Sequence, residues 1–149
     1  MGGVGLSSTR TDRVRVGDHN DVHPRPFNLA EQHTLHLRIL IDAIERGDPE
    51  AQIRAYADRA ALRLIDPDHP PRSPKLLTGK AEIAAWIRDV CSLRMTHRIV
   101  DIVNAGPLVA FTDEMRDRHG TQMVSTTTVT IKHDLIVQQR VILVWDGWD

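Results

Sequence analysis

The stretch TQMVSTTTVTIK, residues 121–132, places two kinds of side chain in alternation. Met123, Ser125, Thr127, Val129 and Ile131 point to one side of an extended chain, whereas the residues between them are mostly polar. A period of two in a segment rich in threonine and valine is typical of a half-buried β-strand. This segment therefore predicts a strand with one face turned toward an apolar interior.

Two similar runs flank this segment, at residues 108–116 and 135–146. The first is joined to it by residues 117–120, which end in a glycine that suits a hairpin loop. Only His133 and Asp134 separate residues 121–132 from the second run, at 135–146. Connections this short require antiparallel neighbours, and a fourth run at 95–103 precedes them. We therefore expect a four-stranded antiparallel meander.

The residues before the meander have the pattern of helices that could cover its apolar face. From caps, glycines and prolines we expect, in order, a helix at 28–47, a helix at 48–60, a strand at 62–65, a loop at 66–74 and a helix from residue 78. Helices gathered before a curved sheet predict an α+β domain with one concave sheet face.

The first residues differ from the rest in composition. Residues 1–26 show no sustained hydrophobic period, so we predict a disordered or loosely attached arm followed by one domain at 27–149. The net charge of −1 gives no electrostatic case for a nucleic-acid or anionic-membrane partner. The single cysteine, Cys91, cannot form an internal disulfide, which is typical of a reducing compartment, and we expect the cytoplasm. We interpret Cys91 as a packing residue rather than a nucleophile.

Several short segments, taken together, resemble the nuclear transport factor 2 superfamily, in particular its SnoaL-like and ketosteroid-isomerase-like branch. They occur in the family's order: AIERGD at 43–48, YAD at 56–58, DP at 66–67, LTGKAEI at 77–83 and IV at 136–137, with WD at 145–146. The likeness covers about residues 27–148. It implies a cone-shaped curved antiparallel sheet wrapped around about three helices, a cystatin-like α+β barrel with an internal pocket. It also implies a homodimer that pairs through the outer sheet face.

The resemblance leaves the reaction open, because this family hosts isomerases, cyclases, dehydratases, epoxide hydrolases and binding modules. Ketosteroid isomerases carry their general base immediately before a proline, and Asp66-Pro67 matches that feature. Their tyrosine on the first helix corresponds to Leu40, and their strand aspartate corresponds to Thr127 or Val129. Leu40 has no hydrogen to donate, so we do not expect steroid isomerisation by that mechanism.

Two aspartates are candidate catalytic residues. Asp66 could act as a base at the mouth of an apolar pocket, and its alternative role is to cap amides within a turn. Asp113 shares one strand face with Phe111 and Met115, which is costly for a charge unless it is paired or protonated. Such conflicts concentrate at functional sites, and the alternatives are a strand bulge or an ion pair with Arg116 or Arg140.

Further residues share the predicted interior. His97 and Asp101 fall on one strand face, but roughly 13 Å separates positions four apart in a strand, so we interpret both as structural. His33 lies on the apolar stripe of the first helix, where we favour a core histidine over a ligand contact. If the interior is a pocket, its substrate-binding residues are predicted to be His33, Tyr56, Trp86, Phe111, Met115, Ser125 and Thr127.

These observations lead to one expected function and one rival. We expect a pocket for a small apolar organic ligand and acid–base catalysis by Asp66 or Asp113, with neither cofactor nor metal. The rival is a non-catalytic ligand-binding or dimerisation module, which the absent tyrosine and strand aspartate favour.

Overall fold

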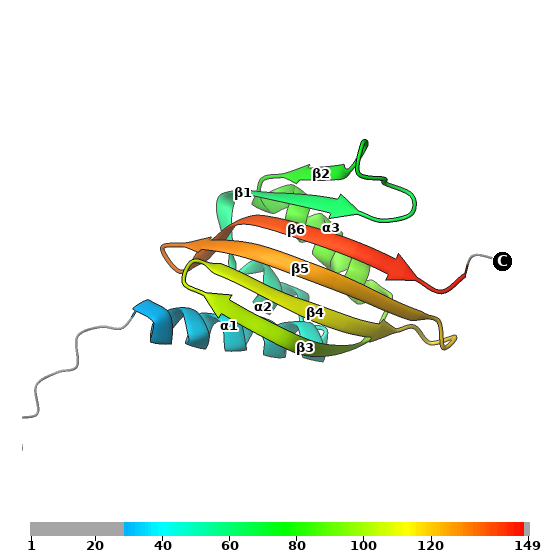
Figure 1. Ribbon diagram of the computed structural model, residues 1–149, viewed down its shortest axis with the longest axis horizontal. Coiled ribbons are helices and arrows are strands. Elements are labelled where there is room, and N and C mark those ends of the chain that lie inside the picture. Colours follow the sequence, from blue (N-terminus) through cyan, green and yellow to red (C-terminus); the bar gives the residue numbers. More distant parts are fainter. Residues whose placement is uncertain (1–28, 148–149) are drawn as a thin grey trace, which may run out of the picture.

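The computed structural model describes the backbone of residues 29–147 and the side chains of residues 36–147. The predicted arm at 1–26 and the first residue of the helix predicted at 28–47 lie outside the described residues. Along the chain the elements are α1 Leu29–Arg46, α2 Pro49–Ile53, β1 Tyr56–Ile65, β2 Lys75–Thr78, α3 Lys80–Ser92, β3 Thr96–Ala105, β4 Leu108–Arg116, β5 Gln122–Lys132 and β6 Leu135–Trp145. The strands form one sheet in the order β2-β1-β6-β5-β4-β3 (Figure 1).

The predicted meander is confirmed. Strands β3, β4, β5 and β6 pair as successive antiparallel neighbours. On β5 the side chains of Ser125, Thr127, Val129 and Ile131 are buried, while Thr126 and Lys132 are exposed, as the alternation indicates. One face of the sheet is therefore the interior face from β3 to β6.

The second predicted helix is wrong in its length. Helix α2 ends at Ile53, and Tyr56 begins strand β1. Tyr56 and Ala60 are both buried, and a spacing of four fits either one helix face or every second inward position of a strand. The hydrogen-bonding partner decides between the two, because β1 pairs in parallel with β6 and antiparallel with β2. Strand β2 itself was missed, since it follows directly from the proline-rich loop.

The turn between α1 and α2 follows the local sequence. Gly47 has a φ of +64°, a conformation in which glycine ends a helix without steric cost. The amide of Asp48 donates to the carbonyl of Ala43 at 2.9 Å. The Asp48 carboxylate then accepts from the amide of Ala51 at 3.1 Å, and Pro49 occupies the first turn of α2. This junction directs α2 back toward β1.

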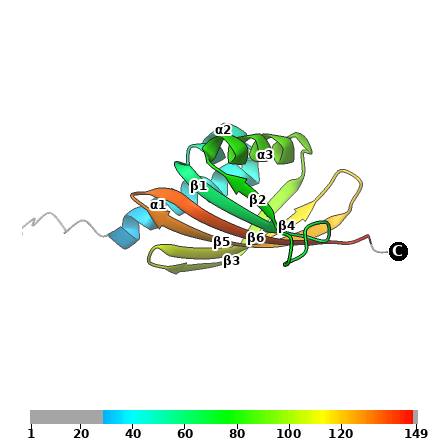
Figure 2. The same ribbon diagram turned by 90° about the horizontal axis from the view of Figure 1, so that it is seen from above.

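The helices lie on one side of the sheet and the sheet curves around them (Figure 2). Leu62, Ile83, Val109 and Val129, each at most 1% exposed, are the most deeply buried large side chains between the two layers. The sheet remains open, with β2 and β3 as its edges. The fold is thus the expected α+β architecture with a concave inner sheet face.

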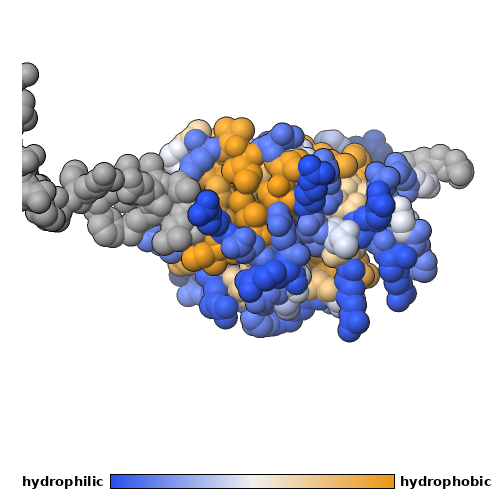
Figure 3. All heavy atoms as spheres, turned by 90° about the horizontal axis from the view of Figure 1, so that it is seen from below, coloured by the Kyte–Doolittle hydropathy of each residue, from blue (hydrophilic) through white to orange (hydrophobic). Residues whose placement is uncertain are grey.

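The opposite face of the sheet is exposed and partly apolar. Val124, Ile142 and Val144 on β5 and β6 are 40%, 45% and 57% exposed. Apolar residues also gather on the side of the molecule that bears β3 (Figure 3), where Val103 and Leu108 are exposed. Within residues 29–147, no helix is both long and apolar enough to span a membrane.

Candidate functional site

A cavity of about 680 Å³ lies between the concave sheet face and the helices. Its volume falls within the range of small-molecule binding sites. Eight of the predicted site residues contribute to its wall: Tyr56, Asp66, Trp86, Phe111, Asp113, Met115, Ser125 and Thr127. The side chain of His33, the remaining predicted site residue, lies outside the described residues. The fold thus brings together residues from three strands, one helix and the loop after β1.

Asp113 and His97 form a hydrogen-bonded pair in the wall of this cavity. Nδ1 of His97 lies 2.8 Å from Oδ2 of Asp113, and both side chains are about nine-tenths buried. The second oxygen, Oδ1, is buried without a hydrogen-bond partner among the described residues. Phe111 and Met115 flank Asp113 on the same strand face, as the sequence predicts. A buried unpartnered carboxylate oxygen typically costs 1–3 kcal/mol or more, so it calls for an explanation.

A bulge in β3 creates this pair. Near the hairpin Ala105 pairs with Leu108, and in that register His97 would pair with Arg116 on the outer face. The register shifts by one residue between Val100 and Val103, where Asp101 adopts a φ of +53°. A shift of one residue moves every following side chain to the other face. His97 consequently pairs with Met115 and shares the inner face with Asp113.

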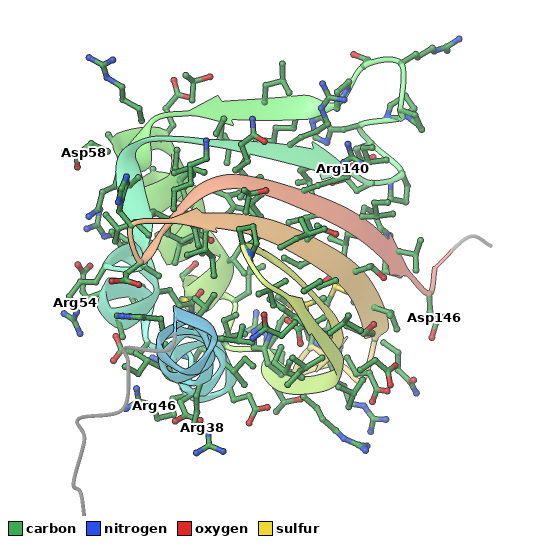
Figure 4. The ribbon with its side chains drawn as sticks, turned by 60° about the vertical axis from the view of Figure 1, so that its left-hand side comes forward. Arg38, Arg46, Arg54, Asp58, Arg140 and Asp146 are labelled. Atoms are coloured by element: carbon green, nitrogen blue, oxygen red, sulfur yellow. The ribbon has the colours of Figure 1, made fainter. Side chains whose placement is uncertain are left out.

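The structure corrects two sequence interpretations here. Arg116 and Arg140, proposed as ion-pair partners of Asp113, are exposed residues of the outer sheet face. Figure 4 shows Arg140 on β6. His97, interpreted as structural, is the partner instead. His97 and Asp101 also fail to share a strand face, because the bulge intervenes and leaves Asp101 exposed. Strand alternation alone could not reveal this pair, since its register depends on the bulge.

Asp66 forms a second pair, with His69, in the wall of the same cavity. Its Oδ1 accepts from the His69 amide at 2.7 Å and lies 2.9 Å from the His69 Nδ1. The backbones of the two residues also bond in both directions, at 3.0 and 3.1 Å. Asp66 thus has the turn-capping contacts of the alternative interpretation and also borders the cavity. His69 is 39% exposed, so this pair is wetter than the first.

A polar track crosses the otherwise apolar inner sheet face. Ser125 lies directly opposite Asp113, and Thr127 is the next inward residue on β5. Thr127 pairs with Val141, whose inward neighbour on β6 is Gln139. Oε1 of Gln139 accepts a hydrogen bond from the hydroxyl of Tyr56 on β1. Burial raises the pKa of Tyr56 well above its usual range, so the phenol stays protonated and can donate.

Sequence reasoning missed Gln139. Its signal is present, because Gln139, Val141 and Leu143 alternate as one face of β6 and a glutamine interrupts that apolar face. The residues that line the cavity include charges of both signs: Lys75, Arg94 and Arg118 are basic, and Asp117 is acidic. Asp117 accepts from the amides of its own loop, at 2.8 and 2.9 Å.

Comparison with known proteins identifies relatives of this architecture. The family model described as SnoaL-like domain matches residues 37–139. No curated protein matches the chain. Among solved structures, a nuclear transport factor 2-like protein of unknown function from Mesorhizobium loti has a TM-score of 0.67 at 14% identity, covering 82% of this chain and 97% of its own.

Two further structures carry names that suggest an activity. A provisionally named ketosteroid isomerase from Kribbella flavida has a TM-score of 0.61 at 17% identity, covering 80% of this chain and 81% of its own. IdmH from Streptomyces antibioticus, provisionally named a polyketide cyclase, has a TM-score of 0.58 at 22% identity, covering 77% of this chain and 92% of its own. Identities this low establish a shared fold, while the activity must be argued from the residues.

Proposed function

We propose that this chain binds a largely apolar organic molecule and moves a proton on it. The premise is that the chain belongs to the SnoaL-like domain family of the nuclear transport factor 2 superfamily. The observation that carries the proposal is the Asp113–His97 pair, buried in the cavity wall with one carboxylate oxygen unpartnered. The sheet and its helices supply the apolar enclosure, and the pair supplies the acid–base chemistry.

The proposed roles follow from the hydrogen bond. A neutral His97 that donates from Nδ1 to Asp113 presents its Nε2 lone pair as a base. Nε2 has no hydrogen-bond partner among the described residues and is not a buried atom, so a ligand can reach it. After proton transfer the imidazolium is stabilised by the Asp113 carboxylate, which has no other hydrogen-bond partner in the described part of the chain. His97 is then the proton acceptor, and Asp113 orients it and balances its charge.

Asp66 stays a second candidate in this proposal. It borders the same cavity, but its Oδ1 already accepts from the backbone and side chain of His69. A carboxylate with these partners and a more exposed histidine is less suited to hold a proton away from water. We therefore assign the first role to the Asp113–His97 pair.

A carbon acid that needs no specific recognition tests the assignment. In 5-nitrobenzisoxazole a base removes the ring C–H proton, its electron pair forms the nitrile, and the N–O bond breaks to give a coloured phenoxide. We expect the wild-type protein to accelerate this step over free imidazole. Asp113→Asn and His97→Gln should each lose about a hundredfold of that acceleration. Asp66→Asn should lose less, and the exposed Asp58→Asn is the matched control (Figure 4).

The same assay separates the rival function. Leu40, at the position of the isomerases' tyrosine, is an apolar core residue only 5% exposed, which favours a non-catalytic binding module. In that case the benzisoxazole would bind and quench tryptophan fluorescence but would not be converted faster than in buffer. Equal rates for wild type, Asp113→Asn and Asp66→Asn would contradict the catalytic assignment.

The proposal includes a homodimer through the outer sheet face. Val124, Ile142 and Val144 are exposed there beside Thr126, and the exposed charged residues Glu114 and Arg140 lie next to this apolar patch. Exposed apolar patches of this kind favour protein–protein contact. A second copy of the chain would cover these side chains without blocking the cavity on the opposite sheet face.

A further inference from the structure

The far end of the polar track contains a hydrogen-bond donor that has no partner within the described part of the chain. The side chain of Gln139 lines the cavity, and its Oε1 is occupied by the hydroxyl of Tyr56. Tyr56 is itself only 4% exposed, so its hydroxyl is held in place by the core. The Nε2 group of Gln139 makes no hydrogen bond to the described residues and is not a buried atom. Its amide hydrogens are therefore available to a molecule in the cavity.

We infer that Gln139 is a specificity residue whose Nε2 binds a carbonyl oxygen of the ligand, with Tyr56 as the positioning residue that orients the amide. The inference rests on the proposed function, because it requires an organic molecule in this cavity. Tyr56 donates to the only acceptor of the Gln139 amide, which turns the donor group away from Tyr56. A site built to donate a hydrogen bond rejects analogues that lack the acceptor, since its polar group is then left unpaired.

The strand register fixes how far this subsite lies from the Asp113–His97 pair. Asp113 is level with Ser125 and, one strand further, with Leu143, while Gln139 is four residues from Leu143. In a flat sheet the Cα atoms of Asp113 and Gln139 would be roughly 16 Å apart, and inward side chains on a concave sheet face lie closer together than their Cα atoms. The ligand therefore has a carbonyl at one end and the group that exchanges a proton at the other.

A matched pair of probes tests the subsite. We would titrate 4-acetyl-4′-hydroxybiphenyl and 4-ethyl-4′-hydroxybiphenyl into the protein and follow tryptophan fluorescence, since Trp86 lines the cavity. The probes differ only in the carbonyl oxygen. We expect the wild-type protein to bind the acetyl probe about tenfold more tightly. Gln139→Glu keeps an acceptor for Tyr56 but removes the donor, and it should abolish this preference.

The controls separate this inference from the proposed function. Gln138→Glu makes the same change one residue away, on the exposed outer face, and should keep the preference. Tyr56→Phe leaves the donor but frees the amide, and should reduce the preference without removing binding of either probe. A preference that survives in Gln139→Glu, or a wild-type protein that binds neither probe, would overturn the inference. Loss of benzisoxazole turnover in Asp113→Asn, with the acetyl preference intact, would leave both proposals standing.

Discussion

The buried Asp113–His97 pair makes a quantitative prediction about stability. Replacing His97 by leucine leaves both oxygens of Asp113 without a hydrogen-bond partner among residues 36–147, in a wall that includes Phe111 and Met115. Removing one partner of a buried pair costs about 3–5 kcal/mol.

We therefore expect His97→Leu to lower the free energy of unfolding by about 3 kcal/mol at pH 7. Urea denaturation of the two proteins, followed by tryptophan fluorescence, measures this difference. The double variant His97→Leu/Asp113→Leu removes the buried charge as well, so its stability should return close to that of the wild-type protein.

The second aspartate–histidine pair is the matched control. His69→Leu leaves Asp66 with the backbone amide of residue 69, and the lost side chain is 39% exposed. We expect a cost below about 1 kcal/mol at pH 7. The reasoning would be refuted by a cost for His97→Leu as small as that for His69→Leu, or by a double variant no more stable than His97→Leu.

Two other regions give predictions of their own. Tyr56 is the only tyrosine of the chain, so tyrosinate absorbance reports its ionisation directly. Its raised pKa predicts that the folded protein ionises this residue only at a higher pH than the unfolded chain does. The unfolded chain ionises this tyrosine near pH 10, whereas the folded protein keeps it protonated. The free energy of unfolding should therefore fall as the pH rises above about 10. Tyr56→Phe should remove that part of the fall. For the dimer, Ile142→Lys should shift the sedimentation coefficient from that of a dimer to that of a monomer. Ile39, on α1, is similarly exposed, and Ile39→Lys should not cause this shift. Wild-type protein that sediments only as a monomer at high concentration would contradict the homodimer.

The local sequence pattern predicted most of the fold. A period of two in residues 108–146, with short polar connections, defines the meander and the inward face of each strand. It also places Asp113 between Phe111 and Met115 on the interior, a conflict that the sequence alone makes visible. Helix boundaries followed from local chemistry where a cap or glycine sets them, as at Gly47 and Asp48.

The local sequence predicted secondary structure less well where pairing with another strand determines the conformation. The segment from Tyr56 to Ala60 has a buried spacing compatible with helix or strand, and the parallel contact with β6 selects the strand. Strand β2 is four residues long and has no period of its own, so its pairing with β1 defines it.

The sequence by itself determined that this is an α+β domain with an acidic residue in its apolar interior, because alternation and capping depend on neighbours along the chain. Only the tertiary structure decided which groups meet. The bulge in β3 brings His97 to Asp113, and the parallel pairing of β1 with β6 brings Tyr56 to Gln139, 83 positions away. Strand register is a property of a pair of strands and cannot be read from the sequence of one strand alone. A register shift of one residue moves a side chain from the surface into the site.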